Sequence, residues 1–123
     1  MSNTNEIVTG FISCWEKKDL DGIMEYFTPD AVYINIPMDP PNEGTEAIRA
    51  FIEGFIGMAS KIEFVVHNQV DNGAGMVMNE RTDRFLINDD WVEIQVMGIF
   101  EVVDGKIAHW RDYFDMAKFS AQM

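Results

Sequence analysis

The fold is decided by a segment that alternates large aromatic and charged side chains, and this segment reads Trp110-Arg111-Asp112-Tyr113-Phe114-Asp115. In a β-strand, successive side chains point to opposite faces, so Trp110, Asp112 and Phe114 share one face. An unpaired carboxylate between two buried aromatic rings would lose its hydration without compensation. Asp112 therefore needs partners, and the segments that precede it must supply them.

Strand-like segments fill the sequence beyond Gly57, where apolar residues alternate with polar ones. The first of the four carries Ile62, Phe64 and Val66, and the others cover residues 76–87, 92–102 and 106–115. Turn sequences separate them, and Asp104-Gly105 is the strongest hairpin signal. The residues from 116 to 123 are predicted to form a short tail or a frayed helix.

Three helices and one strand are predicted before Gly57. Asn3-Thr4-Asn5-Glu6 matches a capping box for the first helix, and Asp19 and Thr45 are expected to cap the other two. Residues 28–30 are expected to end the second helix, and residues 31–36 to form the strand.

The order of these elements predicts an α+β fold in one domain that spans residues 1–123. N-terminal helices followed by long antiparallel strands favour a sheet that curls around the helices into a cone with a pocket. Residues 37–44 contain three prolines, which lack backbone donors, so no regular structure is expected there. We expect that segment to form part of the entrance to the pocket.

Composition excludes several classes of protein. The chain has 123 residues, 47% of them hydrophobic, which is unlike a disordered chain. Its formal net charge of −12 argues against binding to nucleic acid or to anionic membranes. Cys14 is the only cysteine, which leaves no disulfide framework and no cysteine-rich zinc site. The sequence shows neither a signal peptide nor a membrane-spanning run, and we therefore expect a cytoplasmic protein.

A group of polar residues is predicted to point into the cone. In residues 76–87 the apolar side chains occupy odd positions, which turns Arg81 and Asp83 inward as well. Tyr33 and Asn35 share one face of the earlier strand. The interior then holds two carboxylates, a guanidinium, a phenol and a carboxamide. The expected apolar surroundings are Phe85, Ile94, Val96, Trp110 and Phe114.

On spacing alone, this group has two interpretations of equal weight. Arg81 could form a structural salt bridge with Asp83 and Asp112, or the three could be a catalytic group. His67 and His109 do not share the inner face and are interpreted as surface residues. Cys14, on an apolar helix face, is interpreted as inert packing.

Three motifs resemble the limonene-1,2-epoxide hydrolase family. They are Tyr33-Ile34-Asn35-Ile36-Pro37, Asn79-Glu80-Arg81-Thr82-Asp83, and Gly105-Lys106-Ile107 leading into Trp110-Arg111-Asp112-Tyr113-Phe114-Asp115. The resemblance runs through most of the chain. It implies the cone-shaped fold with a strongly curved mixed sheet that is shared with nuclear transport factor two and the SnoaL-like proteins. It also implies a homodimer, and hydrolysis of an epoxide by water to a vicinal diol without a cofactor.

The residues suit this chemistry, which needs one base and one acid. We expect ionised Asp112 to be the base for a water held by Tyr33 and Asn35, and protonated Asp83 to be the acid, with Arg81 between the carboxylates. Ring strain in the epoxide supplies part of the driving force, so no metal is expected. The predicted substrate-binding residues are Trp110, Phe85, Phe114, Ile94, Val96 and Met38, the last at the mouth of the pocket.

Other functions fit the same cone. A ketosteroid isomerase-like or polyketide cyclase-like enzyme needs one base and an oxyanion donor, which leaves Arg81 between two acids superfluous. A non-catalytic protein that binds a small ligand is the other alternative, because one fold hosts many functions.

Overall fold

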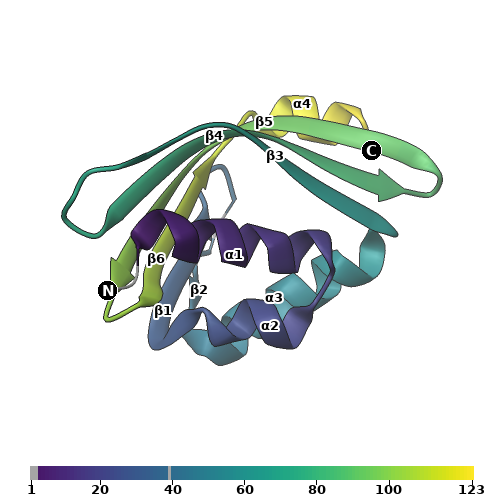
Figure 1. The fold of residues 1–123 in the computed structure, drawn as a ribbon. Coiled ribbons are helices and arrows are strands. Elements are labelled where there is room, and N and C mark those ends of the chain that lie inside the picture. The colour runs from purple at the N-terminus through teal and green to yellow at the C-terminus, as the bar shows by residue number, and fades with distance from the viewer. Residues whose placement is uncertain (1–2, 39) are drawn as a thin grey trace.

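The computed structural model describes residues 3–38 and 40–123, which form one curved sheet and several helices, most of them on the concave side of the sheet (Figure 1). The helices of this part of the chain are α1 (Thr4–Glu16), α2 (Leu20–Glu25), α3 (Gly44–Met58) and α4 (Met116–Ala121). The strands are β1 (Phe27–Asn35), β2 (Asn42–Glu43), β3 (Lys61–Asp71), β4 (Met76–Ile87), β5 (Asp90–Val103) and β6 (Lys106–Tyr113). No helix of the described residues is long and apolar enough to cross a membrane.

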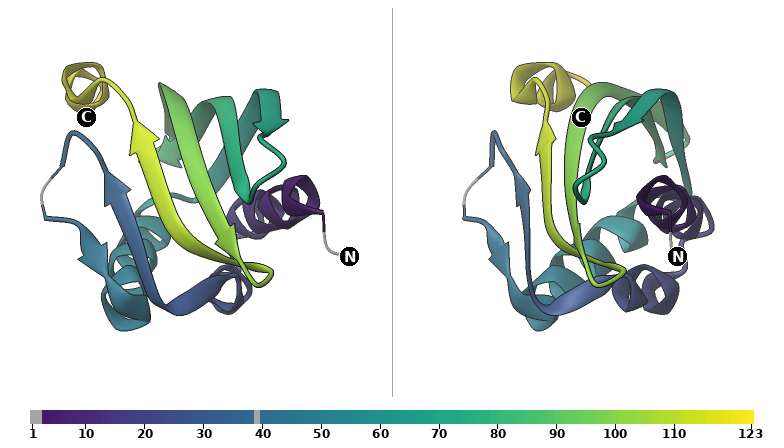
Figure 2. Two further views of the ribbon diagram at one scale, coloured as in Figure 1. Left: turned by 90° about the vertical axis from the view of Figure 1, so that its left-hand side faces the viewer. Right: turned by 60° about the vertical axis from the view of Figure 1, so that its left-hand side comes forward.

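The sheet is mixed and strongly curved. Its strand order is β2-β1-β6-β5-β4-β3. β1 runs parallel to β6, and the other neighbouring strands pair antiparallel. β3, β4 and β5 arch over α1, α2 and α3, while α4 lies apart from these helices, near β5 (Figures 1 and 2). The predicted α+β cone, with its N-terminal helices packed into a curved mixed sheet, is confirmed.

Two of the three predicted N-cap residues form a side-chain hydrogen bond to the first turn of their helix. Asn3 Oδ1 accepts from the Asn5 backbone N–H at 2.8 Å, and Asp19 Oδ1 accepts from Gly22 N–H at 3.0 Å. The third expectation was wrong, because Glu43 rather than Thr45 occupies the N-cap position of α3, two residues earlier, and its side chain makes no capping hydrogen bond.

Two predictions, the start of strand β1 and the end of helix α2, need correction. Strand β1 starts at Phe27, because α2 ends at Glu25 and Phe27 pairs in register with Ile107. Residues 28–30, predicted to end a helix, lie in this strand, where an irregular register before Val32 accommodates the proline.

The proline-containing segment also holds regular structure, contrary to expectation. Asn42 and Glu43 form β2 and pair antiparallel with Tyr33 and Val32, because both follow the prolines and keep their own backbone donors. Asp39, within the predicted entrance segment, lies outside the described residues.

Two hairpin turns match the sequence. Asn88 and Asp89 have φ of 52° and 65°, and Asp104 and Gly105 have φ of 51° and 80°. This left-handed backbone suits two-residue hairpins, and Asn, Asp and Gly tolerate it best. β6 ends at Tyr113, two residues earlier than predicted, because Asp115 caps α4 by accepting from Lys118 N–H at 3.2 Å.

A bulge in β3 changes which of its side chains face inward. Val66 pairs with Arg81 and Gln69 pairs with Asn79, so His67 is an extra residue on β3. Before the bulge the even-numbered Phe64 is buried; after it the half-buried positions are odd. The alternation predicted from sequence therefore holds only up to the bulge, and Val66 is 38% exposed.

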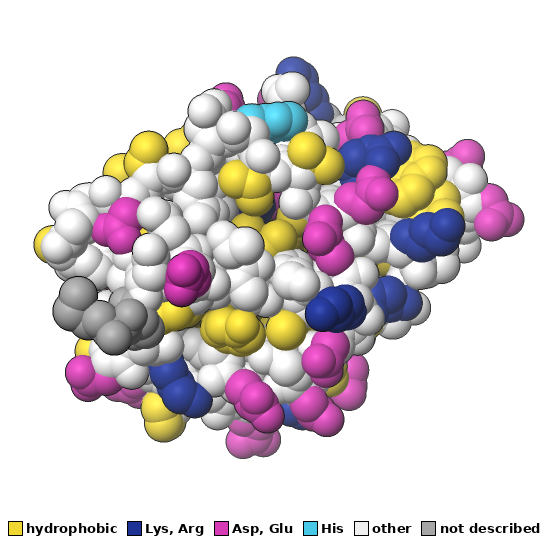
Figure 3. Space-filling model, viewed as in Figure 1, with side chains coloured by type: hydrophobic (Ala, Val, Ile, Leu, Met, Phe, Trp, Pro, Cys, Tyr) yellow, Lys and Arg dark blue, Asp and Glu magenta, His cyan; other side chains and the backbone are white. Residues whose placement is uncertain are grey.

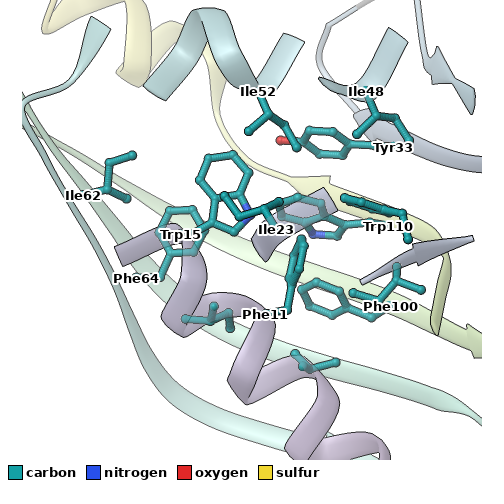
Figure 4. Packing of buried hydrophobic residues seen from close by; sticks show 14 of the residues in the cluster. Phe11, Trp15, Ile23, Tyr33, Ile48, Ile52, Ile62, Phe64, Phe100 and Trp110 are labelled. Atoms are coloured by element: carbon teal, nitrogen blue, oxygen red, sulfur yellow. The ribbon is translucent and has the colours of Figure 1, made fainter. Parts of the chain in front are cut away.

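The core lies between the helices and the concave face of the sheet (Figure 4). Phe11 of α1 meets Phe27, Phe100 and Trp110 edge-on, with ring centroids 5.0–6.0 Å apart. Each such buried aromatic side chain contributes about 1.5–3 kcal/mol by leaving water. On the face shown in Figure 3, acidic side chains are scattered rather than gathered in one patch.

Candidate active site

A cavity of about 340 Å³ lies between the sheet and helices α3 and α4. Most of its lining is apolar, and the polar side chains on it are Tyr33, Asn35, Asp83 and Asp112. A largely apolar pocket with a few convergent polar groups is the usual form of a small-molecule site.

Arg81 joins two carboxylates at the wall of this cavity. Its Nε and Nη2 donate to Asp83 Oδ1 and Oδ2 at 2.9 and 3.0 Å, and Nη2 also donates to Asp112 Oδ2 at 2.8 Å. The three residues are 1%, 3% and 4% exposed in the order Arg81, Asp83, Asp112. The inward orientation predicted for all three is correct. Removing one member of such a buried set leaves an uncompensated charge, which is strongly destabilising.

Gly98 makes room for this arrangement. It lies on β5 between β4 and β6, in register with Asn79 on one side and Asp112 on the other. A Cβ atom at this position would be 2.4 Å from Arg81 Nη1 and 2.7 Å from Asp112 Oδ1. The guanidinium thus passes over β5 to reach Asp112 because position 98 carries no side chain.

Burial and neighbouring charges set the protonation of Asp112 and Arg81. Burial raises the pKa of Asp112 to about 6; the Arg81 guanidinium opposes this rise and the charge of Asp83 adds to it. The indole Nε1–H of Trp110 donates to Asp112 Oδ1 at 2.7 Å and also favours its ionised form. Burial alone would lower the pKa of Arg81, but Asp112 and Asp83 raise it overall, so the guanidinium stays charged.

Tyr33 and Asn35 form a polar pair next to Asp112. Asn35 Nδ2 donates to Tyr33 Oη at 3.1 Å, and Asn35 pairs in register with Asp112 across the β1–β6 ladder. The Tyr33 ring stacks on Trp110 with centroids 4.1 Å apart and planes within 8°. Burial, and next the charge of Asp112, raise the pKa of the Tyr33 hydroxyl, which therefore remains protonated.

The predicted pocket residues separate into two groups. Those that line the cavity are Phe85, Phe114, Ile94, Val96 and Met38. Trp110 is not among the lining residues: it is 1% exposed and lies behind Tyr33, because its indole N–H is directed at Asp112.

Sequence reasoning missed the walls contributed by helices. Phe51, Phe55 and Met58 of α3 line the cavity, as do Phe119 and Met123 at the C-terminal end of the chain. The apolar stripe of α3 is visible in the sequence, but its periodicity does not separate core-facing from cavity-facing positions. Nothing in the sequence identifies α4 as a wall.

The Gln122 side chain links the end of helix α4 to strand β5. Gln122 Oε1 accepts from Glu93 N–H at 2.9 Å, and its Nε2 donates to Glu93 O at 2.7 Å. Glu93 lies on a part of β5 that pairs with β4 but not with β6, which first meets β5 at Met97. The Gln122 amide therefore takes the place of a strand at this free edge.

Other reactive side chains lie apart from the site. His67 and His109 are exposed, as predicted, and His67 Nε2 hydrogen-bonds Thr82 Oγ1 at 2.8 Å. Burial raises the pKa of the Cys14 thiol. Within the described ranges, no three His, Cys, Asp or Glu side chains are grouped so that they could hold a metal ion.

Known proteins share both the sequence and the fold. The chain matches the limonene-1,2-epoxide hydrolase catalytic domain over residues 2–123. It is 34% identical over 111 residues to the epoxide hydrolase EphG of Mycobacterium tuberculosis (strain ATCC 25618 / H37Rv), covering 89% of this chain and 71% of EphG. It is also similar to the structure of an LEH-like epoxide hydrolase from M. tuberculosis, with a TM-score of 0.84 and 29% identity over 97% of this chain and 87% of the other.

A more distant neighbour shows the fold alone. A putative SnoaL-like polyketide cyclase from Shewanella denitrificans OS-217 has a TM-score of 0.88 at 15% identity, over 97% of this chain and 95% of that chain. The cone expected from the sequence is thus confirmed. Because the family model covers nearly the whole sequence, this chain belongs to the limonene-1,2-epoxide hydrolase family and is an epoxide hydrolase.

Proposed function

We propose that this protein adds water in one step to an apolar or cyclic epoxide and releases a vicinal diol. Asp112 acts as the base, Asp83 as the acid, and Tyr33 and Asn35 hold the attacking water beside Asp112. The observation that carries the proposal is the bridge from Arg81 to two buried carboxylates at the wall of an apolar cavity. A structural salt bridge alone would have no need to expose both acids to that cavity.

The steps balance without any other reactant. Asp112 removes a proton from the water while the water oxygen bonds to a ring carbon. The carbon–oxygen bond of the epoxide breaks, and Asp83 gives its proton to the departing oxygen, which stays attached to the product. The enzyme is left with a proton on Asp112 and a charge on Asp83, and a proton transfer between them through water restores the starting state. Each assisted transfer contributes about 100- to 10,000-fold.

The position of the water-holding pair supports the choice of Asp112 as the base. Asn35 is in register with Asp112, and of the nearby charges Asp112 has the largest effect on the Tyr33 hydroxyl. A base works best when its pKa lies near the working pH, and the pKa of Asp112 is raised to about 6. Arg81 contacts both acids and supplies one positive charge to the pair, which suits a cycle that starts with one ionised carboxylate and one proton.

The cavity wall supports an apolar substrate. Phe85, Ile94, Val96 and Phe114 offer apolar area and no hydrogen-bonding side-chain group, so they favour a hydrocarbon skeleton. The polar groups lie together, which suits a substrate with a single polar end. Terpene, cycloalkene and styrene oxides have this shape.

The test is diol formation from a panel of such epoxides. Wild-type protein should release diol, and Asp83→Asn and Asp112→Asn should each abolish it while thermal unfolding remains cooperative. Wild-type turnover in either variant would refute the assigned roles. Absence of diol with every epoxide in the panel would refute the proposed substrate class.

A labelling experiment separates one-step hydrolysis from a covalent route. In a single turnover in ¹⁸O-water, direct attack places the label in the diol. A carboxylate that attacks the ring itself would form an ester, and label would appear in the side chain of Asp112 or Asp83. Label in the protein would overturn the one-step mechanism but not the activity.

The proposal includes a homodimer, which the family resemblance implies, and a cytoplasmic location, which was predicted from the sequence. Light scattering coupled to gel filtration should give a mass twice that of the chain, and fractionation of the source cells should place the protein in the cytoplasm. A monomeric mass would contradict the first expectation.

A further inference from the structure

Arg81 has a hydrogen-bond partner that is not one of the two acids. Its Nη1 donates to Asn79 Oδ1 at 2.8 Å, and Asn79 is 1% exposed. Asn79 is not among the residues that line the cavity. Any effect it has on the reaction must therefore pass through Arg81.

The orientation of Asn79 is fixed by a second amide. Asn79 Nδ2 donates to Gln69 Oε1 at 3.1 Å. A flipped Asn79 would set two donors against each other at Arg81 and two acceptors against each other at Gln69. Only one orientation satisfies both neighbours, and it presents an oxygen to the guanidinium.

Gln69 is in turn tied to the first turns of α1. Its Nε2 lies 3.3 Å from both the backbone oxygen and Oδ1 of Asn5, and 3.4 Å from Thr9 Oγ1. The amides of Asn79 and Gln69 thus each accept a hydrogen bond from the neighbour nearer to Arg81 and donate one to the neighbour nearer to α1. The result is a relay of hydrogen bonds that all run in the same direction, from the guanidinium to a packed helix.

The bulge at His67 brings Gln69 into this relay. Because of the extra residue, Gln69 rather than Asn68 lies opposite Asn79, and Asn68 donates instead to Glu80 on the exposed side at 2.9 Å. Bulges near active sites commonly redirect a side chain in this way. The bulge and the relay therefore form a single structural feature.

We propose that Asn79 and Gln69 are positioning residues that hold the Arg81 guanidinium at the angle where its fork meets Asp83 and Asp112. This inference rests on the proposed function of those three residues. An arginine side chain has many rotamers, and a fork that contacts two acids must be fixed to within fractions of an ångström. The salt bridges restrain one edge of the guanidinium, and Asn79 restrains the other.

Neutral substitutions along the relay provide the test. Asn79→Leu and Gln69→Leu remove an amide without changing charge. We expect Asn79→Leu to lower kcat by about 10- to 100-fold, the value of one buried hydrogen bond to a charged group. Gln69→Leu should lower kcat less, and KM should stay the same in both because neither residue lines the cavity. The double variant should be no slower than Asn79→Leu, since both changes act through one contact.

The pH profile gives a readout that a merely structural role would not move. A loosely held guanidinium stabilises ionised Asp112 less, so the acidic limb of kcat/KM should shift to higher pH in both variants. Asn68→Ala is the matched control, because it removes a cross-strand amide contact at the same bulge on the exposed face. Its kcat and pH profile should equal those of the wild type.

The outcomes separate the two proposals. If Asp83→Asn or Asp112→Asn keeps wild-type activity, the proposed function fails. If both are inactive while Asn79→Leu and Gln69→Leu keep the wild-type kcat and pH profile, only the positioning role is overturned. Multiplicative losses in the double variant would also overturn it. If Asn79→Leu does not fold, the Gln69→Leu variant tests the positioning role by the same kcat and pH criteria, because Gln69 is only half-buried.

Discussion

Replacing Gly98 by alanine is the sharpest test of how closely the site is packed. The new Cβ would lie 2.4 Å from Arg81 Nη1, 2.7 Å from Asp112 Oδ1 and 3.1 Å from Asn79 Oδ1. Ordinary van der Waals contact begins near 3.4 Å, so the guanidinium must move by about 1 Å. The end of a flexible side chain would usually move easily, but the Arg81 guanidinium is hydrogen-bonded to three other side chains.

The expected consequence is a loss of turnover with little loss of binding. A displacement of about 1 Å in a catalytic group costs about 100-fold in rate, and Gly98 is not among the residues that line the cavity. We therefore expect kcat to fall about 100-fold with KM nearly unchanged. Overpacking should also lower the free energy of unfolding by about 1–3 kcal/mol and Tm by about 4–12 °C.

The assay is steady-state diol formation on the substrate that the panel identifies, together with thermal unfolding. Gly57→Ala is the control, because a Cβ there would meet nothing within 4 Å and α3 would gain helix propensity of about 1 kcal/mol. A Gly98→Ala protein with wild-type kcat would show that the exact position of the guanidinium does not matter. That result would refute the link between close packing around Arg81 and turnover.

Four further predictions concern Asp112 and helix α4. Because the pKa of Asp112 is raised to about 6 and the base must be ionised, kcat/KM should fall about tenfold per pH unit as the pH drops below 6. The raised pKa also means that the native state binds the Asp112 proton more tightly than the unfolded chain does. The contribution of Asp112 to the free energy of unfolding should therefore decline as the pH rises from about 4 to 6. A free energy of unfolding that stays constant across this pH range would contradict the raised pKa. Trp110→Phe removes the indole donor and should lower kcat about tenfold and move the acidic limb to higher pH, which a pH series of kcat/KM measures. Gln122→Ala frees the backbone of Glu93, and we expect a higher KM, a kcat close to wild type and a loss of about 1 kcal/mol in urea unfolding. An unchanged KM would show that the contact between Gln122 and Glu93 does not position α4 at the cavity.

Simple alternation of side chains was enough to predict the orientation of the central residues. Arg81 and Asp83 share a strand with buried odd-numbered apolar side chains, and Asp112 lies two residues from Trp110. Both strands are regular at these positions, so parity holds from the core to the site. A buried charged group was therefore visible in the sequence before its partners were known.

The same rule cannot anticipate a change of parity. The bulge at His67 reverses the inward face of β3, and with it come Gln69 and the anchoring of Asn79. The helical walls escaped prediction for a different reason. The apolar stripe on α3 indicates that Phe51 and Phe55 face the interior of the protein. Whether they contact the core or line the cavity depends on the curvature of the sheet, whose strands come later in the sequence.

The parallel pairing of β1 with β6 has a consequence for how the enzyme comes into existence. Tyr33 and Asn35 stand on β1, whose long neighbour is the strand that carries Asp112. During synthesis on the ribosome, β3, β4 and β5 are all made before β6. Until β6 is made, one edge of β1 has no partner strand, and the other edge can pair only with the two residues of β2. Closing such a distant pair is slow. During refolding, hydrolytic activity should return only with the final phase.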